Sequence, residues 1–95
     1  MTRFRASFIL AAAILASITA AEAQSRRCRV MDPTGTPLNV RATPGGEVTG
    51  QLPNGMLVNR AEEARDNRGR TWVFVHDRTT GDPVGWVFRE FVSCF

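Results

Sequence analysis

Few side chains in this 95-residue sequence are suited to acid–base or nucleophilic catalysis. The chain has one histidine, His76, and two cysteines, Cys28 and Cys94. A single histidine on an expected strand is more often a packed or solvent-facing residue than a catalytic base. Glu62 and Glu63 are adjacent, so their side chains point in different directions and do not form a pair of catalytic carboxylates. The sequence therefore predicts that the protein is not an enzyme.

The residues that could bind a metal ion form only incomplete ligand sets. Asp77 and Asp82 lie in one loop with two threonines, but two carboxylates without EF-hand spacing favour a solvated loop over a calcium site. Two cysteines and one distant histidine are likewise a poor zinc set. We therefore expect neither a metal ion nor another cofactor.

All 12 basic residues are arginines, and the formal net charge of the chain is +3. Three arginines cluster at 26–29 and three at 65–70. Arginine provides planar donors that can bind a carboxylate through two parallel hydrogen bonds. A nucleic-acid-binding protein usually has a larger excess of positive charge, interleaved with aromatic residues. We therefore predict no nucleic-acid partner and interpret most of these arginines as solvated surface residues.

The first 23 residues have the three-part pattern of a secretory signal peptide. Two early arginines precede an apolar segment at 8–16, and 21–23 is a cleavage site with small residues at its first and third positions. The apolar segment is shorter than the roughly 20 residues that a membrane-spanning helix needs. Since Cys28 does not directly follow the cleavage site, we expect no lipid anchor. Residues 1–23 are thus predicted to be removed, leaving a periplasmic or secreted chain without a membrane span.

The predicted mature chain, residues 24–95, is one small domain. A core of that size is marginally stable and usually needs an additional cross-link. In an oxidising compartment an even number of cysteines indicates a disulfide, so we expect Cys28 and Cys94 to tie the two ends together. On the chain-entropy model such a bridge stabilises the fold by roughly 4 kcal/mol. The alternative is that the two cysteines are metal ligands.

Beyond residue 27 the sequence alternates short apolar segments with turn residues and has no sustained helical period. Proline, glycine, asparagine and aspartate mark turns at 32–37, 43–46 and 53–55. The segment 62–70 is expected to be a polar loop. The pattern predicts an all-β barrel of five to six short antiparallel strands, because closure leaves fewer exposed strand edges. The expected strand segments are 28–31, 38–41, 48–52, 56–61, 71–76, 84–88 and 92–94.

Two of these segments, 71–76 and 84–88, flank a loop and are expected to pair as a hairpin. If His76 lies opposite Val84, the alternation of strand residues places four aromatic side chains on one face and three valines with a glycine on the other. A small barrel has one interior, so one set must lie outside it, covered by another segment or forming a binding surface. The two sets are Trp72, Phe74, Trp86 and Phe88, and Val73, Val75, Gly85 and Val87.

These segments resemble the bacterial SH3-like domain family. The motifs that carry the resemblance are L-N-V-R-A-T-P-G-G at 38–46, G-Q-L-P-N-G at 50–55, W-V-F-V at 72–75 and G-W-V at 85–87. Each motif is short, but their order and spacing together match the family pattern. The resemblance implies an SH3-like barrel over residues 24–95, in which Leu38 and Val40 contribute to the core and Arg41 faces the loops.

The second half of the chain also resembles the eukaryotic SH3 pattern. On that match Trp72 takes the place of the groove tryptophan, and Trp86, Phe88 and Phe91 take the places of the other groove residues. The valines fall at core positions, in agreement with the two faces of the hairpin. The chain has no tyrosine and no acidic first loop, so the match does not extend to the recognition of P-x-x-P peptides.

Members of the bacterial family commonly bind peptidoglycan or other cell-wall peptides. The resemblance implies an exported binding module of the envelope that combines aromatic contact area with an arginine able to pair with a ligand carboxylate. The residues expected to form this site are Trp72, Trp86, Phe88, Phe91 and Arg41. An arginine of the 65–70 segment is a further candidate.

Two other interpretations remain open at this point. Trp72 and Trp86 are large residues that small domains often bury, so each is equally a candidate for packing alone. The same aromatic surface would also suit a protein-interaction, assembly or inhibitor module for an envelope enzyme. The sequence does not predict an oligomeric state.

Overall fold

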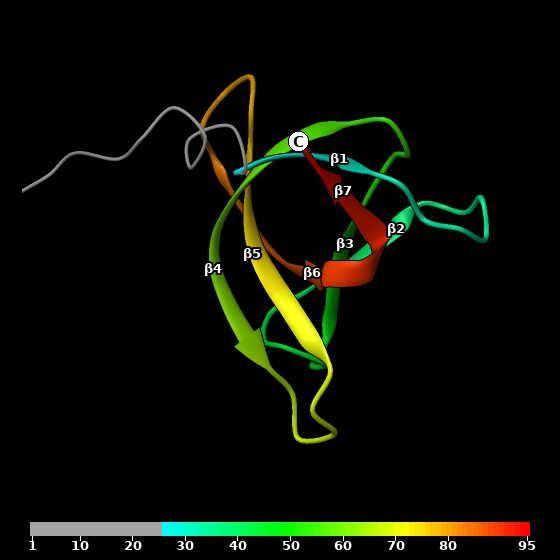
Figure 1. Ribbon diagram of the computed structural model, residues 1–95, viewed down its shortest axis with the longest axis vertical. Coiled ribbons are helices and arrows are strands. Elements are labelled where there is room, and N and C mark those ends of the chain that lie inside the picture. Colours follow the sequence, from blue (N-terminus) through cyan, green and yellow to red (C-terminus); the bar gives the residue numbers. More distant parts are fainter. Residues whose placement is uncertain (1–25) are drawn as a thin grey trace, which may run out of the picture.

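The computed structural model describes residues 26–95, which form strands joined by turns and a single short 3-10 helix (Figure 1). The expected signal peptide lies outside the described residues. Within 26–95, no helix has the length and apolar character needed to cross a membrane. The elements are β1 Arg27–Val30, β2 Leu38–Arg41, β3 Val48–Leu52, β4 Leu57–Arg65, β5 Thr71–Asp77, β6 Pro83–Phe88, η1 Arg89–Phe91 and β7 Val92–Cys94.

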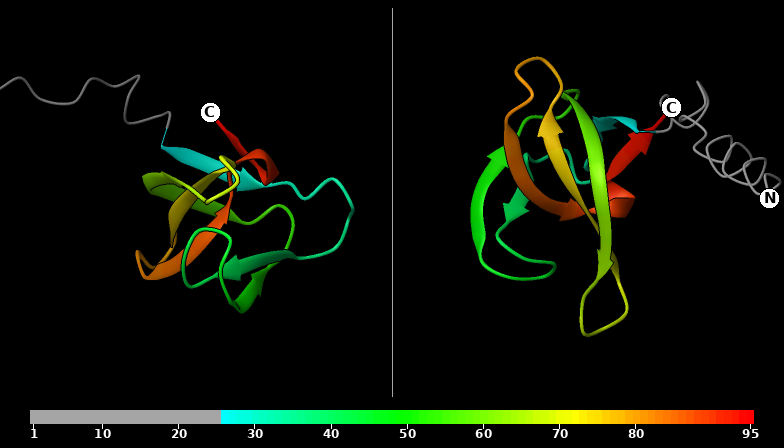
Figure 2. Two further views of the ribbon diagram at one scale, coloured as in Figure 1. Left: turned by 90° about the horizontal axis from the view of Figure 1, so that it is seen from below. Right: turned by 90° about the vertical axis from the view of Figure 1, so that its left-hand side faces the viewer.

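All seven strands belong to one antiparallel sheet with the order β3-β2-β6-β5-β4-β1-β7. The sheet bends back on itself into a barrel-like shape, but its end strands β3 and β7 are not joined by hydrogen bonds (Figure 2). The expected all-β, SH3-like fold is confirmed. Each of the seven expected strand segments corresponds to a strand, and all seven join the sheet, whereas a barrel of five to six strands was expected.

The interior of the curved sheet is packed mainly with valine side chains. Val73, Val75 and Val87 are fully buried, so the valine face of the β5–β6 hairpin lies inside, as its alternation predicts. Because the aromatic residues of the same strands point the other way, they remain available to form an outer surface. The residues of the core are Cys28, Val30, Leu38, Val40, Leu52, Val58, Val73, Val75, Val87 and Val92.

Gly85 allows β2 to lie close against β6. It has a φ of 147°, and a Cβ atom at this position would lie 2.6 Å from Cγ1 of Val40 and 3.1 Å from the carbonyl oxygen of Arg41. These separations are too short for any side chain. β2 carries Arg41, which pairs directly with Trp86 of β6.

The register of the β5–β6 hairpin agrees with the expected one over most of its length. Trp72 lies opposite Phe88 and Phe74 opposite Trp86. His76, however, pairs with Pro83 rather than Val84, because a register shift follows Val75. A β-bulge of this kind accommodates one extra residue and increases the local twist of the strand.

The expectation of a polar loop at 62–70 is wrong for its first half, because β4 continues to Arg65. An irregularity between Arg60 and Glu62 shifts the register by one residue, after which pairing with β5 resumes as far as Arg65 opposite Thr71. Three of the four residues at 62–65 are charged and exposed, so no apolar alternation reveals the extension. Backbone hydrogen bonds to β5 form the strand nonetheless.

The expected disulfide between Cys28 and Cys94 is confirmed. The two residues lie directly opposite each other in the β1–β7 ladder, and Cys28 is fully buried. Since the sulfur atoms are bonded to each other, the two cysteines are not a pair of metal ligands. The bridge spans a sequence separation of 66 residues and therefore links the two ends of the described domain.

Candidate binding site

The turn between β4 and β5 is organised around the carboxylate of Asp66. One carboxylate oxygen, Oδ1, accepts hydrogen bonds from the backbone N–H groups of Arg68 and Arg70, each at 2.9 Å. The other, Oδ2, accepts from Nε of Arg70 at 2.8 Å and from Nε1 of Trp72 at 3.0 Å. Only 3% of the Asp66 side chain is exposed. The carboxylate thus links the turn to the indole of a site residue.

These contacts alter the acidity of Asp66. Desolvation raises its pKa, but the hydrogen bonds from the Trp72 side chain, from the Arg70 and Arg68 backbone and from the Arg70 side chain together outweigh that effect. The pKa of the Asp66 carboxyl group therefore lies well below its ordinary value. The group remains an anion at neutral pH and serves as an acceptor for all four donors.

Trp72 lies on the outer face of β5, yet only 5% of it is exposed. The guanidinium carbon of Arg41 lies 5.6 Å from the centroid of the Trp72 ring system. The Phe88 ring lies 5.4 Å from Trp72 in an edge-to-face arrangement. With its indole N–H bonded to Asp66, Trp72 is a fixed support for its neighbours.

The 3-10 turn η1 reverses the chain after β6 and brings Phe91 back beside Phe88. The two ring centroids are 5.0 Å apart, again edge to face. Both side chains are half-buried. Phe91 also packs against the core, so the part of the ring that stays exposed is held in place by the interior.

Arg41 ends β2 and points toward the turn that follows it, as the resemblance implied. Its Nη1 donates a hydrogen bond of 2.7 Å to the carbonyl oxygen of Gly46. This bond, together with the position over Trp72, restricts the guanidinium group. Arg41 is half-buried and lies at the edge of a pocket instead of extending freely into solvent.

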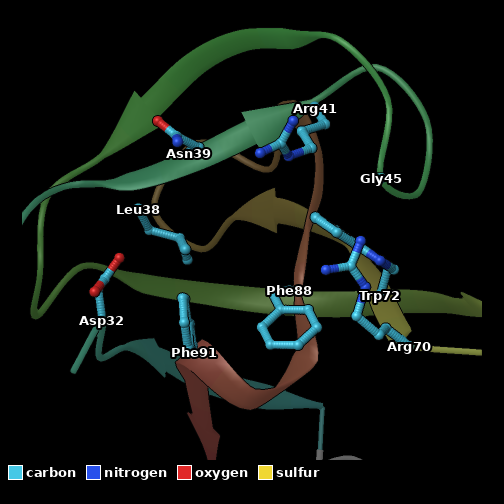
Figure 3. Close-up of a pocket in the computed structure, with 9 residues that line it drawn as sticks. All are labelled: Asp32, Leu38, Asn39, Arg41, Gly45, Arg70, Trp72, Phe88 and Phe91. Carbon is cyan, nitrogen blue, oxygen red and sulfur yellow. The ribbon is translucent and has the colours of Figure 1, made fainter. Parts of the chain in front are cut away.

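These side chains surround a pocket of about 320 Å³ (Figure 3). Arg41 and Arg70 lie with Trp72 toward one end, and Asp32 lies toward the other, beside Phe91 and Leu38. The pocket therefore has a cationic end, an apolar middle and an anionic end. Its lining residues are Asp32, Leu38, Asn39, Arg41, Gly45, Arg70, Trp72, Phe88 and Phe91.

Trp86 is the one expected site residue that does not line this pocket. Its ring packs against Phe74 with centroids 5.6 Å apart, and Phe74 in turn lies 5.4 Å from the His76 ring. The aromatic residues that share one face in the sequence pattern are therefore divided between the pocket and a second outer cluster.

The sequence alone does not identify Asp66 or Asp32 as residues of the site. It indicates an arginine of the 65–70 segment as a candidate but does not single out Arg70. The segment Asp66–Gly69 carries one usable signal, because an aspartate at the first position of a turn with a glycine at the fourth is typical of such turns. That signal predicts the turn but not the contact with Trp72. Asp32 comes from a loop that only the fold brings to the pocket.

Asp77, one of the two aspartates weighed above as calcium ligands, forms hydrogen bonds within its own loop. Oδ1 of Asp77 accepts hydrogen bonds from the backbone N–H groups of Thr79 and Thr80, at 2.7 and 3.2 Å. Asp77 thus stabilises the β5–β6 turn. In the part of the chain that the structure describes, no three histidine, cysteine, aspartate or glutamate side chains gather in a way suited to a metal ion.

Residues 36–93 match the family model described as the bacterial SH3 domain. The protein belongs to the bacterial SH3 domain family. Bacterial SH3 domains are protein- and peptide-binding modules and are generally non-catalytic. No curated protein and no solved structure shows a significant match to the chain.

Within this bacterial SH3 domain, the matched residues include every pocket residue except Asp32. Cys28 and Cys94 both lie outside the match. The disulfide therefore lies outside the matched segment, whereas the aromatic pocket residues and Arg41 lie within it. The pocket can be considered as a site of the bacterial SH3 domain itself.

Proposed function

We propose that the protein is an exported, non-catalytic binding module of the bacterial envelope that recognises peptidoglycan or a cell-wall peptide. The observation that carries the proposal is the pocket in which aromatic and arginine side chains converge from β2, the β4–β5 turn, β5, β6 and η1. The disulfide is compatible with an oxidising compartment outside the cytoplasm. The signal-peptide pattern of residues 1–23 supports export to such a compartment.

The apolar middle of the pocket suits the backbone and aliphatic side chains of a short peptide. Phe88 and Phe91 are half-buried, so each ring exposes part of its surface while packing holds it in position. Rings held in this way provide contact area at a small entropic cost. A pocket of about 320 Å³ admits a small part of a polymer, such as one or two residues of a peptide.

The cationic end suits a carboxylate, which the peptide stems of the cell wall carry. Arg41 is restricted by Gly46 and Trp72, so little conformational entropy is lost when it pairs with a carboxylate through two hydrogen bonds. At the opposite end, Asp32 provides a carboxylate that suits a ligand amine. One Asp32 oxygen, Oδ1, is already engaged by the backbone and hydroxyl of Thr34.

The test is co-sedimentation of the purified, disulfide-bonded protein with peptidoglycan over a series of salt concentrations. We expect Phe88→Ala to weaken binding by about tenfold, because truncating a central aromatic residue of a binding site is commonly this costly. Trp86→Ala is the matched control, since Trp86 lies on the same strand and face but outside the pocket. Trp72→Ala is less informative, because Trp72 also supports the Asp66 turn.

Three outcomes would count against the proposal. If Trp86→Ala reduces binding as much as Phe88→Ala, the pocket is not the site. If binding disappears in moderate salt and Phe88→Ala leaves it unchanged, it is non-specific attraction by the arginines. If the unmodified protein does not sediment with peptidoglycan, the alternative is an envelope protein as partner, and crosslinking should then recover that protein.

A further inference from the structure

A second hollow, of about 670 Å³, lies where β1 begins, β5 ends and the β5–β6 turn follows. None of its lining residues carries a carboxylate, and none of them belongs to the pocket described above. The polar and charged residues that line it are Arg26, Arg27, Asn59, Arg60, His76 and Arg78. Any role of this hollow is therefore separate from the proposed peptide site.

Three of these residues form a row across neighbouring strands. Arg27 of β1 lies directly opposite Asn59 of β4, which lies directly opposite His76 of β5. Directly paired residues point to the same side of a sheet, with Cβ atoms about 5 Å apart. The adjacent pair, Cys28 and Val58, is fully buried. The row therefore faces outward, on the side opposite the core.

Backbone contacts hold three more arginines beside this row. The N–H group of Arg60 donates a 2.8 Å hydrogen bond to the carbonyl oxygen of Arg26, which ties the start of the described chain to β4. The N–H group of Arg78 donates at 3.3 Å to Leu57, at the beginning of β4. Residues from the beginning of β1, from β4, from the end of β5 and from the β5–β6 turn line one hollow.

The positive charge of the hollow is largely uncompensated. Within residues 26–95, Arg26, Arg27 and Arg78 form no ion pair with a carboxylate. Arg60 lies 3.6 Å from Glu63, measured from Nη1 to Oε1. A guanidinium group stays charged at all physiological pH values, so the cluster repels itself unless an anion occupies it.

We propose that this hollow binds a phosphate-bearing anion. A single carboxylate is satisfied by one arginine, whereas a phosphate or diphosphate offers enough acceptor oxygens for several guanidinium groups. The Asn59 amide supplies a further donor. His76 is oriented by its edge-to-face contact with Phe74, at 5.4 Å between ring centroids. The site combines donors from β1, β4, β5 and the following turn.

The test is calorimetric titration of the purified protein with tripolyphosphate at low salt. We expect the double variant Arg27→Gln with Arg78→Gln to bind at least about tenfold more weakly, because each loses a charge-assisted hydrogen bond. The control is Arg65→Gln with Arg68→Gln, which removes the same charge from the β4–β5 turn and should preserve binding. If the test variant does not fold, Arg26→Gln replaces it, since that side chain is exposed.

A second arm identifies the source of the phosphate. Binding of tripolyphosphate without binding to phosphatidylglycerol vesicles supports a soluble anion, and vesicle binding that tripolyphosphate displaces supports a lipid headgroup. Vesicles of phosphatidylcholine are the neutral control. The absence of tripolyphosphate binding, or an equal loss in the two double variants, would overturn the proposal. Because Phe88 lines the first pocket and does not line this hollow, Phe88→Ala should leave tripolyphosphate binding unchanged.

Discussion

At the scale of single residues, one buried carboxylate, that of Asp66, supports the candidate pocket although Asp66 does not itself line it. Asp66 accepts four hydrogen bonds and thereby connects the β4–β5 turn to both Arg70 and Trp72. Trp72 in turn contacts Arg41 and Phe88. Asp66 is therefore a positioning residue, and we expect its substitution to reduce the stability of the fold.

We predict that Asp66→Asn lowers the thermal unfolding temperature at neutral pH and weakens its pH dependence. The folded-state pKa of Asp66 is lowered, so its stabilising contribution is fully present above the unfolded value, about 3.9. That contribution is lost as the pH falls further toward the folded-state pKa. Thermal unfolding measured at several values between about pH 2 and 7 should show the unmodified protein losing more stability below pH 4 than the variant.

The matched control is Asp82→Asn, which removes an exposed carboxylate for which no side-chain hydrogen bond occurs in the described structure. An acid transition as steep in the Asp66 variant as in the unmodified protein would contradict the assignment.

At the scale of elements, the close contact of β2 with β6 places Arg41 beside the β5–β6 hairpin. The contact requires glycine at position 85, where φ is 147° and a Cβ atom would meet both Val40 and the Arg41 carbonyl group. Arg41 belongs to β2, whereas Phe88 belongs to β6. The separation of these two strands therefore determines the width of the pocket.

We predict that Gly85→Ala destabilises the fold by roughly 2–4 kcal/mol, since it adds both backbone strain and a steric clash in the core. Urea unfolding measures this change directly. Gly50→Ala is the matched control, because no atom lies within 4 Å of the added Cβ position, and it should change stability little. Equal effects of the two substitutions would show that close packing of β2 on β6 is not the cause.

At the scale of the whole molecule, one covalent bond compensates for a small core. The core residues are mostly valines, which bury less apolar surface than larger side chains. β1 and β7 are short strands of 4 and 3 residues, and the Cys28–Cys94 bond joins them. The ends of the domain are thus held by the disulfide as well as by strand pairing.

We predict that reduction of the disulfide lowers the free energy of unfolding by roughly 4 kcal/mol, because it restores the chain entropy of the unfolded state. The measurement is urea unfolding with and without dithiothreitol. The double variant Cys28→Ala with Cys94→Ala should resemble the reduced protein and should not respond to the reductant. Identical urea midpoints for the oxidised and reduced protein would refute a stabilising role.

Much of the fold followed from local patterns in the sequence. Alternation determined which residues of 71–76 and 84–88 share a face, because strand geometry places every second side chain on the same side. Turn residues located the ends of β2 and β3, which agree with the expected segments. The even number of cysteines indicated the disulfide. These properties depend on neighbouring residues or on a simple count, so the sequence is sufficient to determine them.

The composition of the pocket was decided only by the tertiary structure. Phe88 lines the pocket and Trp86 does not, although the two residues alternate onto one face of β6. The bulge in β4 and the hydrogen bonds around Asp66 bring Arg70 to Trp72. The loop before β2 brings Asp32 to the same pocket. The pocket brings Asp32 and Arg41 together with residues of β5 and β6 that are far from them in the chain, and local periodicity carries no information about how the sheet bends to do so.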